Sequence, residues 1–578
     1  MVLFALTSSS SSKLKQRSHQ SFSESLMEDS IEDAESIIHR WISPQLLDIS
    51  SSSSFCCITS LFSTGNREEA TRFIAAVKTL HSGMVRLIST NPASLKLVRA
   101  ENLMRISMDH LAKEFYRILK SNRRYLDPES VSVRSRKVSH GEDADAMADL
   151  KMIADCMTSS GYGRECFRIY RKIRKSIIVE AMDRLGFEDL SLSQMQKLDW
   201  EYLEKKMRNW LRAARKAVTT LFYGERILSD HVFSSSSAAI RESSFAEITL
   251  QSALTMFTFP ENMAKSRKSP EKIFLTLDVY QSIVELLPVI EEVFSYDSTS
   301  PVKSQIDVTL TDLEEGVISM LDEFESSIAK ESSKSLISGG GIHQLTRYVM
   351  NFIVFLADYS DPLADIISKT PSSFTGDVDS SSSSSPLAKR ISWLILFLLC
   401  KIDAKSRLYN DVALSYLFLI NNLNYVGVKV RTSNLKEILS EDWLEKHEGK
   451  VKKYVAKFVE IVWGEMVVMM TSLSTTAEEE EEEEAEEVVR RFSDRFEEAY
   501  KRQTGWVVPD SKLRDEIKVS VAMMLIPAYA ECNKKCRVGL RKNVGFVPED
   551  IGNYLSDLYF GTGGSGIVSS IHSSDTDI

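Results

Sequence analysis

The sequence predicts an all-α protein built from packed helical bundles. Apolar residues recur at alternating steps of three and four along much of the chain, which is the period of a helix with one buried face. Only 23 glycines and 13 prolines occur among 578 residues, so long helices meet few breaks. No stretch alternates between apolar and polar residues for long enough to require a sheet. Such helices can stack into a rod or form compact bundles, and periodicity alone does not separate the two.

Four segments show this period clearly, and each is expected to bury one stripe of side chains. The segment that begins near residue 67 has a helix start signal, with Asn66 as N-cap and Glu69 three residues later. In the next segment, Pro92 suits the first turn of a helix. The stripes are Phe73, Val77, Leu80, Met84 and Leu87; Met104, Met108, Leu111, Phe115 and Ile118; Leu310, Leu313, Val317, Leu321, Phe324 and Ile328; and Leu345, Val349, Phe352 and Leu356.

Serine tracts at 8–12, 50–54, 234–237 and 380–385 cannot bury apolar area and are interpreted as mobile loops or linkers. With the other shifts in composition they predict the domain organisation. The segments are a largely disordered Ser-rich N-terminus at 1–62, an N-terminal helical bundle at 63–200, central helical bundles at 201–375, a Ser-rich linker at 376–390, the first part of a C-terminal helical bundle at 391–475, an acidic loop at 476–488, the far end of that bundle at 489–561 and a disordered tail at 562–578.

The acidic segment holds nine glutamates among residues 478–487. So many like charges repel one another, so this run is expected to be poorly ordered, as a solvated loop or a frayed helix. An interaction site is the alternative interpretation of the same charges.

Charge and hydropathy exclude several classes. Lys and Arg number 71 against 81 Asp and Glu, and a net charge of −10 argues against a general nucleic-acid-binding protein. The apolar run at 391–400 has ten residues, which is too short to span a membrane and is expected as a buried core helix. The N-terminus lacks the features of a signal peptide, and seven cysteines form no framework, so we expect a reduced cytosolic protein.

Sequence motifs for catalysis, cofactors or metals are missing. The nine histidines are scattered, and Cys532 and Cys536 have no second pair to complete a zinc site. The glycines at 161–163 and 339–341 lack the residues of a phosphate loop. We therefore expect no enzyme, no cofactor, no metal and no catalytic residue.

A basic cluster lies near the C-terminus, where Lys534, Lys535, Arg537, Arg541 and Lys542 occur without an intervening carboxylate. Cations near an anionic membrane contribute about 1 kcal/mol each. The cluster predicts either a membrane contact or a solvated helix surface. On a continuous helix Lys534, Lys535, Arg541 and Lys542 share a face, whereas Arg537 points away.

An ordered set of short segments resembles the Exo-seventy subunit family of the exocyst, in its plant form, from about residue 100 to residue 561. The resemblance fades before residue 60. The segments include Trp210-Leu-Arg-Ala-Ala-Arg-Lys-Ala-Val218, Leu277-Asp-Val-Tyr280, Leu345-Thr-Arg-Tyr-Val-Met-Asn351, Leu419-Ile-Asn-Asn-Leu-Asn-Tyr425, Trp506-Val-Val-Pro-Asp510, Ile526-Pro-Ala-Tyr529 and Pro548-Glu-Asp550.

This resemblance implies an elongated rod of stacked antiparallel helical bundles. It implies a cytosolic, peripheral plasma-membrane subunit that tethers secretory vesicles in exocytosis. The implied partners are other exocyst subunits, small GTPases and phosphatidylinositol 4,5-bisphosphate, bound at the end formed by 489–561. Lys542 matches the first basic residue of the family's lipid motif, but Gly545 stands at the second. We therefore assign lipid binding to Lys534, Lys535, Arg541 and Lys542.

The alternative function is a diverged helical adaptor that presents a motif to another partner, such as autophagy receptors. Asp199-Trp-Glu-Tyr-Leu203 and Phe187-Glu-Asp-Leu190 fit the aromatic-x-x-aliphatic pattern of such motifs. Trp200 and Leu203 lie in a strongly helical stretch, however, and these peptides bind as added strands. Order in residues 187–203 would therefore argue against the adaptor.

Overall fold

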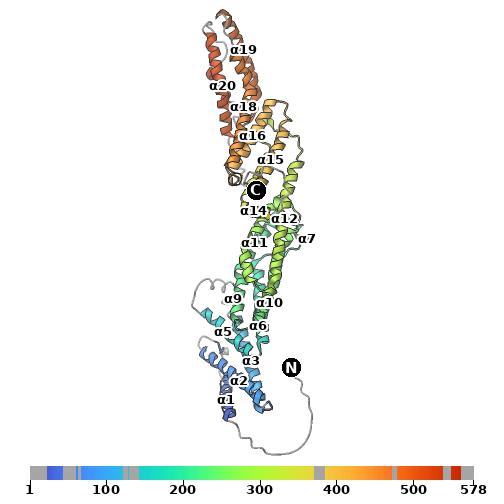
Figure 1. The fold of residues 1–578 in the computed structure, drawn as a ribbon, viewed down its shortest axis with the longest axis vertical. Helices are drawn as coiled ribbons and strands as arrows, with labels where there is room; N and C mark the ends of the chain where they lie inside the picture. Colours follow the sequence, from blue (N-terminus) through green and yellow to red (C-terminus); the bar gives the residue numbers. More distant parts are fainter. Residues whose placement is uncertain are drawn as a thin grey trace, which may run out of the picture. The chain divides into compact units, whose positions relative to one another are not determined.

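The computed structural model describes residues 22–42, 60–62, 67–90, 92–121, 128, 142–369, 385–471, 478–537 and 548–561. Within these ranges the regular structure is helical, apart from one isolated antiparallel bridge between Val507 and Phe560 (Figure 1). The predicted all-α class is confirmed.

The chain divides into two compact units, one made of residues 1–267 and 279–312 and the other of 268–278 and 313–578. These units are coarser than the bundles expected from the sequence, whose boundaries stay predictions. Helices α11 (Ile273–Val293) and α12 (Ser300–Lys330) contribute to both units. Unit 1 otherwise contains α1 (Phe22–Ile42), α2 (Arg67–Thr90), α3 (Leu95–Ser121), α5 (Glu142–Ser159), α6 (Gly163–Leu185), α7 (Leu192–Met195), α8 (Trp200–Lys216), α9 (Tyr223–Val232) and α10 (Ala238–Ala264). Unit 2 otherwise contains α13 (Gln344–Ala357), α14 (Ser360–Lys369), α15 (Pro386–Ser406), α16 (Val412–Arg431), α17 (Leu435–Leu439), α18 (Glu441–Thr471), α19 (Glu478–Gln503), α20 (Ser511–Arg537) and α21 (Pro548–Ser556).

The predicted apolar stripes form much of the core. Helices α2 and α3 pack together. Helix α2 buries Phe73, Val77, Leu80 and Leu87, and α3 buries all five of its expected residues. In α13 three of the four expected residues, Val349, Phe352 and Leu356, are buried as well, and Leu345 is half-buried. Helix α1 lies in the segment expected to be largely disordered, and it is ordered because Ile31, Ala34 and Ile38 pack on this bundle.

A glycine turn at 339–341 connects α12 to α13 in unit 2. Asn421 on α16 donates to the Gly340 carbonyl at 2.7 Å, and Asn422 accepts from the Thr346 hydroxyl at 2.7 Å. Gly339 has φ of +68°, and a Cβ there would lie 2.6 Å from the Gly505 carbonyl. This turn is therefore a structural element, and Asn421 and Asn422 of the resembling segment at 419–425 anchor it.

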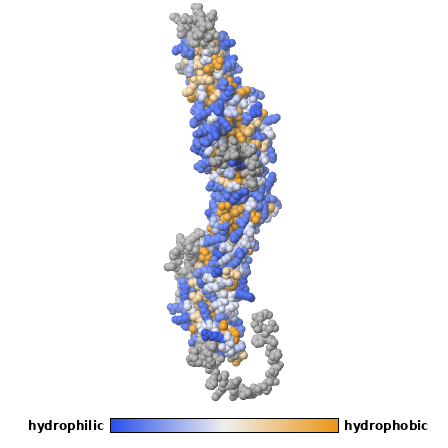
Figure 2. Space-filling model, in the orientation of Figure 1, coloured by the Kyte–Doolittle hydropathy of each residue, from blue (hydrophilic) through white to orange (hydrophobic). Residues whose placement is uncertain are grey.

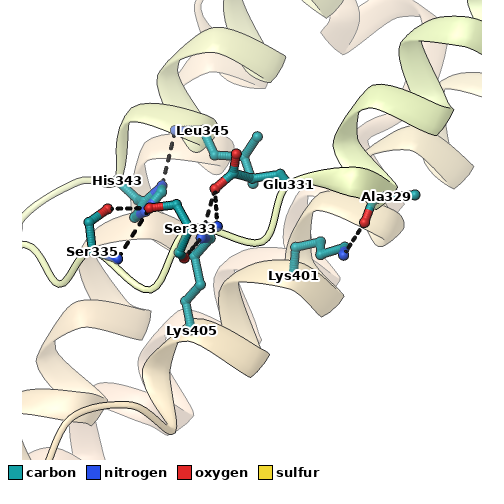
Figure 3. A network of polar contacts seen from close by, with 8 residues as sticks. All are labelled: Ala329, Glu331, Ser333, Ser335, His343, Leu345, Lys401 and Lys405. Atoms are coloured by element: carbon teal, nitrogen blue, oxygen red, sulfur yellow. Dashed lines mark hydrogen bonds and ion pairs between the residues drawn. The ribbon is translucent and has the colours of Figure 1, made fainter.

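Beside that turn, a polar network ties the end of α12 to α15 (Figure 3). The Lys405 ammonium donates to the Ser333 carbonyl at 2.7 Å and to the Glu331 carboxylate at 3.2 Å. Nδ1 of His343 accepts from the Leu345 N–H at 3.0 Å and so caps α13. The pKa of His343 is lowered because burial and the nearby Lys405 charge disfavour its protonated form.

One expectation about an apolar segment needs correction. The run at 391–400 lies in α15 and is only partly buried, since Trp393 is 40% and Leu396 is 52% exposed. Figure 2 likewise shows hydrophobic groups among the hydrophilic surface. The helix Pro270–Val293, which was not singled out, is apolar and long enough to cross a membrane by length and composition, with mean hydropathy 1.6. Half of its most apolar 18-residue window is buried inside the fold.

Candidate functional site

The cationic end of α20 is the described part of the predicted lipid site. One side of α20 is buried at intervals of four residues, by Leu513, Ile517, Val521, Leu525 and Tyr529, and then by Cys532. Lys534 follows Cys532 by two residues, about 200° around the helix, and it is exposed. A cation at the last turn also interacts favourably with the helix dipole. Lys534 thus faces away from the packed side of α20.

The other predicted site residues are described incompletely. The backbone of Lys535 and of Arg537 is helical and α20 ends at Arg537. Arg541 and Lys542, like Gly545, lie outside the described residues. The shared face of the four cations therefore stays a prediction.

The structure adds a lysine stripe on α18 that sequence reasoning missed. Lys446, Lys450, Lys453 and Lys457 are exposed and spaced by four, three and four residues, which places them on one side of the helix. The opposite side is buried through Leu444, His447, Val451, Phe458 and Val462, among others. Lys457 pairs with Glu460 at 3.0 Å. The four lysines span about 16 Å of helix at 1.5 Å per residue, so this stripe can meet an extended anionic surface.

The acidic run at 478–487, expected as a poorly ordered loop or a frayed helix, is helical and forms the start of α19. Glutamate is a good helix former, and this propensity outweighs the repulsion along the run. The rings of Phe492 on α19 and Tyr529 on α20 lie 4.7 Å apart. The consecutive helices α19 and α20 pack on each other and run in opposite directions. Glu487 lies five residues before Phe492, and Lys534 lies five residues after Tyr529, so the backbones at these two positions are level with each other. The acidic start of α19 therefore lies beside the cationic end of α20.

The two adaptor motifs lie in described, ordered segments. Leu203 is 3% exposed on α8, and Leu190 is 7% exposed with its carbonyl accepting from the Asn262 amide at 2.9 Å. Both aliphatic anchors are thus part of the core of unit 1. A receptor cannot bind them as an added strand without unpacking this region.

Cys532 is also buried against the core. Among the described residues, no group of three or more His, Cys, Asp or Glu side chains is arranged to hold a metal ion.

Comparisons with known proteins bear on the whole chain. A family model for the exocyst complex subunit Exo70, C-terminal, matches residues 208–557, and a model for the exocyst complex component Exo70, N-terminal, matches residues 30–121. The second match begins earlier than the resemblance expected from the sequence. The chain is 28% identical to exocyst complex component EXO70B1 of Arabidopsis thaliana over 506 residues, which cover 81% of this chain and 79% of that protein. It is 30% identical to Arabidopsis EXO70A1 over 426 residues, covering 71% and 66%.

The fold is similar to that of solved yeast chains. A Saccharomyces cerevisiae Exo70 structure matches with a TM-score of 0.57 and 15% identity, over 92% of this chain and 98% of that chain. A second crystal structure of the yeast protein matches with the same TM-score and 14% identity, over 92% and 100%. This likeness confirms the predicted fold of stacked helical bundles.

Proposed function

The chain belongs to the Exo70 family of exocyst subunits, and from this premise we propose that it tethers secretory vesicles to the plasma membrane during exocytosis. The match of the C-terminal family model over residues 208–557 carries the proposal. The family places the chain in exocytosis together with other exocyst subunits. Its part is structural rather than catalytic: it holds partners and a membrane surface in position as a cytosolic, peripheral membrane protein.

We further propose that unit 2 supplies the membrane contact. The contact consists of Lys534, Lys535, Arg541 and Lys542, with the lysine stripe on α18 as a second basic surface. The exposure of Lys534 and of the stripe supports this assignment. Each cation contributes about 1 kcal/mol of attraction to an anionic membrane. Four cations that face the same membrane therefore offset the attraction lost because Gly545 replaces a basic residue. The expected ligand is an anionic phosphoinositide such as phosphatidylinositol 4,5-bisphosphate.

Liposome sedimentation tests the C-terminal contact. The full chain should bind vesicles that carry phosphatidylinositol 4,5-bisphosphate weakly and in a salt-sensitive way, because salt screens charges beyond about 10 Å at 0.1 M. Replacing Lys534, Lys535, Arg541 and Lys542 with Ala should abolish binding, whereas Arg537→Ala should have a smaller effect. If the quadruple variant sediments as well as the parent chain, these residues are not the membrane contact.

A further inference from the structure

The outer face of α20 carries exposed apolar side chains on successive turns of the helix. Met523 is 75% exposed and Val519 is 50% exposed, and Pro527 is exposed one turn after Met523. We call these three residues the α20 apolar patch. They point away from the core, because Met523 lies about 200° around the helix from the buried Leu525. Exposed apolar groups that adjoin one another, unlike single ones, indicate a binding surface.

The α20 apolar patch is free of charge. No charged residue occurs between Lys518 and Glu531 in the sequence. The Lys518 ammonium is directed to another part of unit 2, where it donates to the Ser556 carbonyl and lies 4.4 Å from the Phe560 ring centroid. Glu531 is exposed, but it lies about 80° around the helix from Met523. The surface that contacts a partner here is therefore apolar.

Pro527 limits how dry the environment of this patch can be. It lies inside α20 and has no N–H, so the carbonyl of Met523 lacks its helical hydrogen bond. A carbonyl without a partner is costly in a protein core or in the hydrocarbon of a membrane. The patch thus suits a boundary at which apolar side chains are covered while the backbone still reaches water or polar groups.

Lys534 of the proposed membrane contact lies in line with the patch. It follows Met523 by eleven residues, which is about 20° from three full turns and about 16 Å along the helix. Both residues therefore face the same surface. A stable protein partner needs about 800 Å² and 20–30 residues on each side, which this narrow patch does not supply. Helices at a membrane interface, in contrast, bury such a face only about 5–10 Å deep.

We propose that the α20 apolar patch inserts shallowly into a bilayer that contains phosphoinositides. The inference rests on the proposed membrane contact of unit 2 and adds apolar burial to its charge attraction. Met523 lies at the boundary of head groups and acyl chains, and its carbonyl accepts from water or from a hydroxyl of an inositol head group. Lys534 meets lipid phosphates at one end of the patch. Helix α20 then lies along the membrane plane rather than end-on.

Replacing Val519 and Met523 together with Ser tests the patch without changing any charge. We expect this double variant of the full chain to bind vesicles with phosphatidylinositol 4,5-bisphosphate about tenfold more weakly in sedimentation. It should also lose insertion into a monolayer of the same lipids, measured as a rise in surface pressure. Salt screens charges but not apolar burial, so its vesicle binding should be more sensitive to salt than that of the parent chain.

The matched control replaces Val179 and Val308 with Ser. Both are exposed valines of unit 1, at 44% and 55%, and this double variant should bind and insert like the parent chain. Met523→Trp is a second variant with the opposite expected result. It should tighten vesicle binding and increase insertion, because tryptophan favours the membrane interface.

Two results would overturn the inference and leave the cationic contact standing. One is parent-like vesicle binding and insertion by the variant with Ser at 519 and 523, and the other is equal weakening in the control. A parent chain that binds no vesicles would refute the cationic contact and this inference together. If the Ser variant binds vesicles like the parent but no longer recovers exocyst subunits in a pull-down, the patch is a protein contact. Weaker binding by Met523→Trp would also contradict insertion.

Discussion

Single residues determine the stability of unit 1 where a charge is buried. Arg174 on α6 and Glu225 on α9 are both 0% exposed, and the guanidinium donates to the carboxylate at 2.6 and 2.9 Å. The Tyr170 hydroxyl donates to the same carboxylate at 3.1 Å. Breaking a buried pair by removing one partner costs about 3–5 kcal/mol because the other charge stays unpaired. We predict a loss of that size in the free energy of unfolding for Arg174→Met, measured by urea denaturation.

The exposed pair formed by Arg168 and Glu165 on the same helix is the control. Arg168→Met should leave the free energy of unfolding nearly unchanged, since solvent screens this pair. Equal losses in the two variants would show that burial does not determine the effect.

His343 makes part of the stability of unit 2 dependent on pH. Its pKa is lowered by burial first and by the Lys405 charge second, while Glu331 opposes them. The unfolded chain therefore binds this proton more readily, so the contribution is present above the ordinary pKa of about 6.5 and is lost as the pH falls below it. Protonation also removes the acceptor for the Leu345 N–H.

We predict that His343→Asn, which keeps a capping side chain without a titrating group, loses less stability than the parent chain between pH 7 and pH 5. Urea denaturation at the two pH values measures the difference. His39→Asn is the control, because His39 is exposed and lies on α1. A parent-like loss in His343→Asn would contradict a role for this histidine.

At the scale of helices, the stripe on α18 makes a prediction separate from the C-terminal cluster. Replacing Lys446, Lys450, Lys453 and Lys457 with Ala should weaken binding to vesicles with phosphatidylinositol 4,5-bisphosphate at least tenfold, at about 1 kcal/mol per cation. Sedimentation measures the change. The control replaces four exposed lysines of unit 1 with Ala, which are Lys172, Lys175, Lys197 and Lys205. It therefore has the same net charge as the stripe variant. Equal weakening in both variants would indicate a net-charge effect instead of a surface.

The acidic start of α19 should oppose membrane binding, because it lies level with the end of α20 and competes with lipid phosphates for the same cations. Changing the nine glutamates of 478–487 to Gln keeps the helix and removes the charge. We predict several-fold tighter vesicle binding and an almost unchanged melting temperature. Unchanged affinity would show that the run does not shield the cations, and a loss of several degrees would show that its charges stabilise the fold.

The helices themselves were largely predictable, because residues such as Phe73 and Phe115 must repeat at the helical period to reach one core. The continuous helix at 478–487 was expected only as a frayed helix or a loop, since repulsion was weighted above glutamate's helix propensity. The lysine stripe is visible in the sequence only when the buried side of α18 is known. Once that side is known, the spacing of four, three and four identifies the stripe.

At the scale of the whole molecule, sequence patterns do not reveal what separate helices assemble. A pocket of about 470 Å³ in unit 1 brings together Lys78, Asp155 and Ser235 from three distant segments, and no local motif links them. Several of the family-like segments, in contrast, serve the fold. Trp210 is fully buried with its indole donating to the Met256 carbonyl at 2.8 Å, and Asn421 anchors the turn at 339–341. The resemblance identified the family through residues that maintain its architecture.

The central claim is that this chain acts as an exocyst subunit. An affinity pull-down of the tagged full chain from its native cells, read by mass spectrometry, tests it most directly. We predict that the other exocyst subunits are recovered in comparable amounts, as they are with a second tagged exocyst subunit in the same cells. Recovery of the complex with that second subunit, but not with this chain, would contradict the claim.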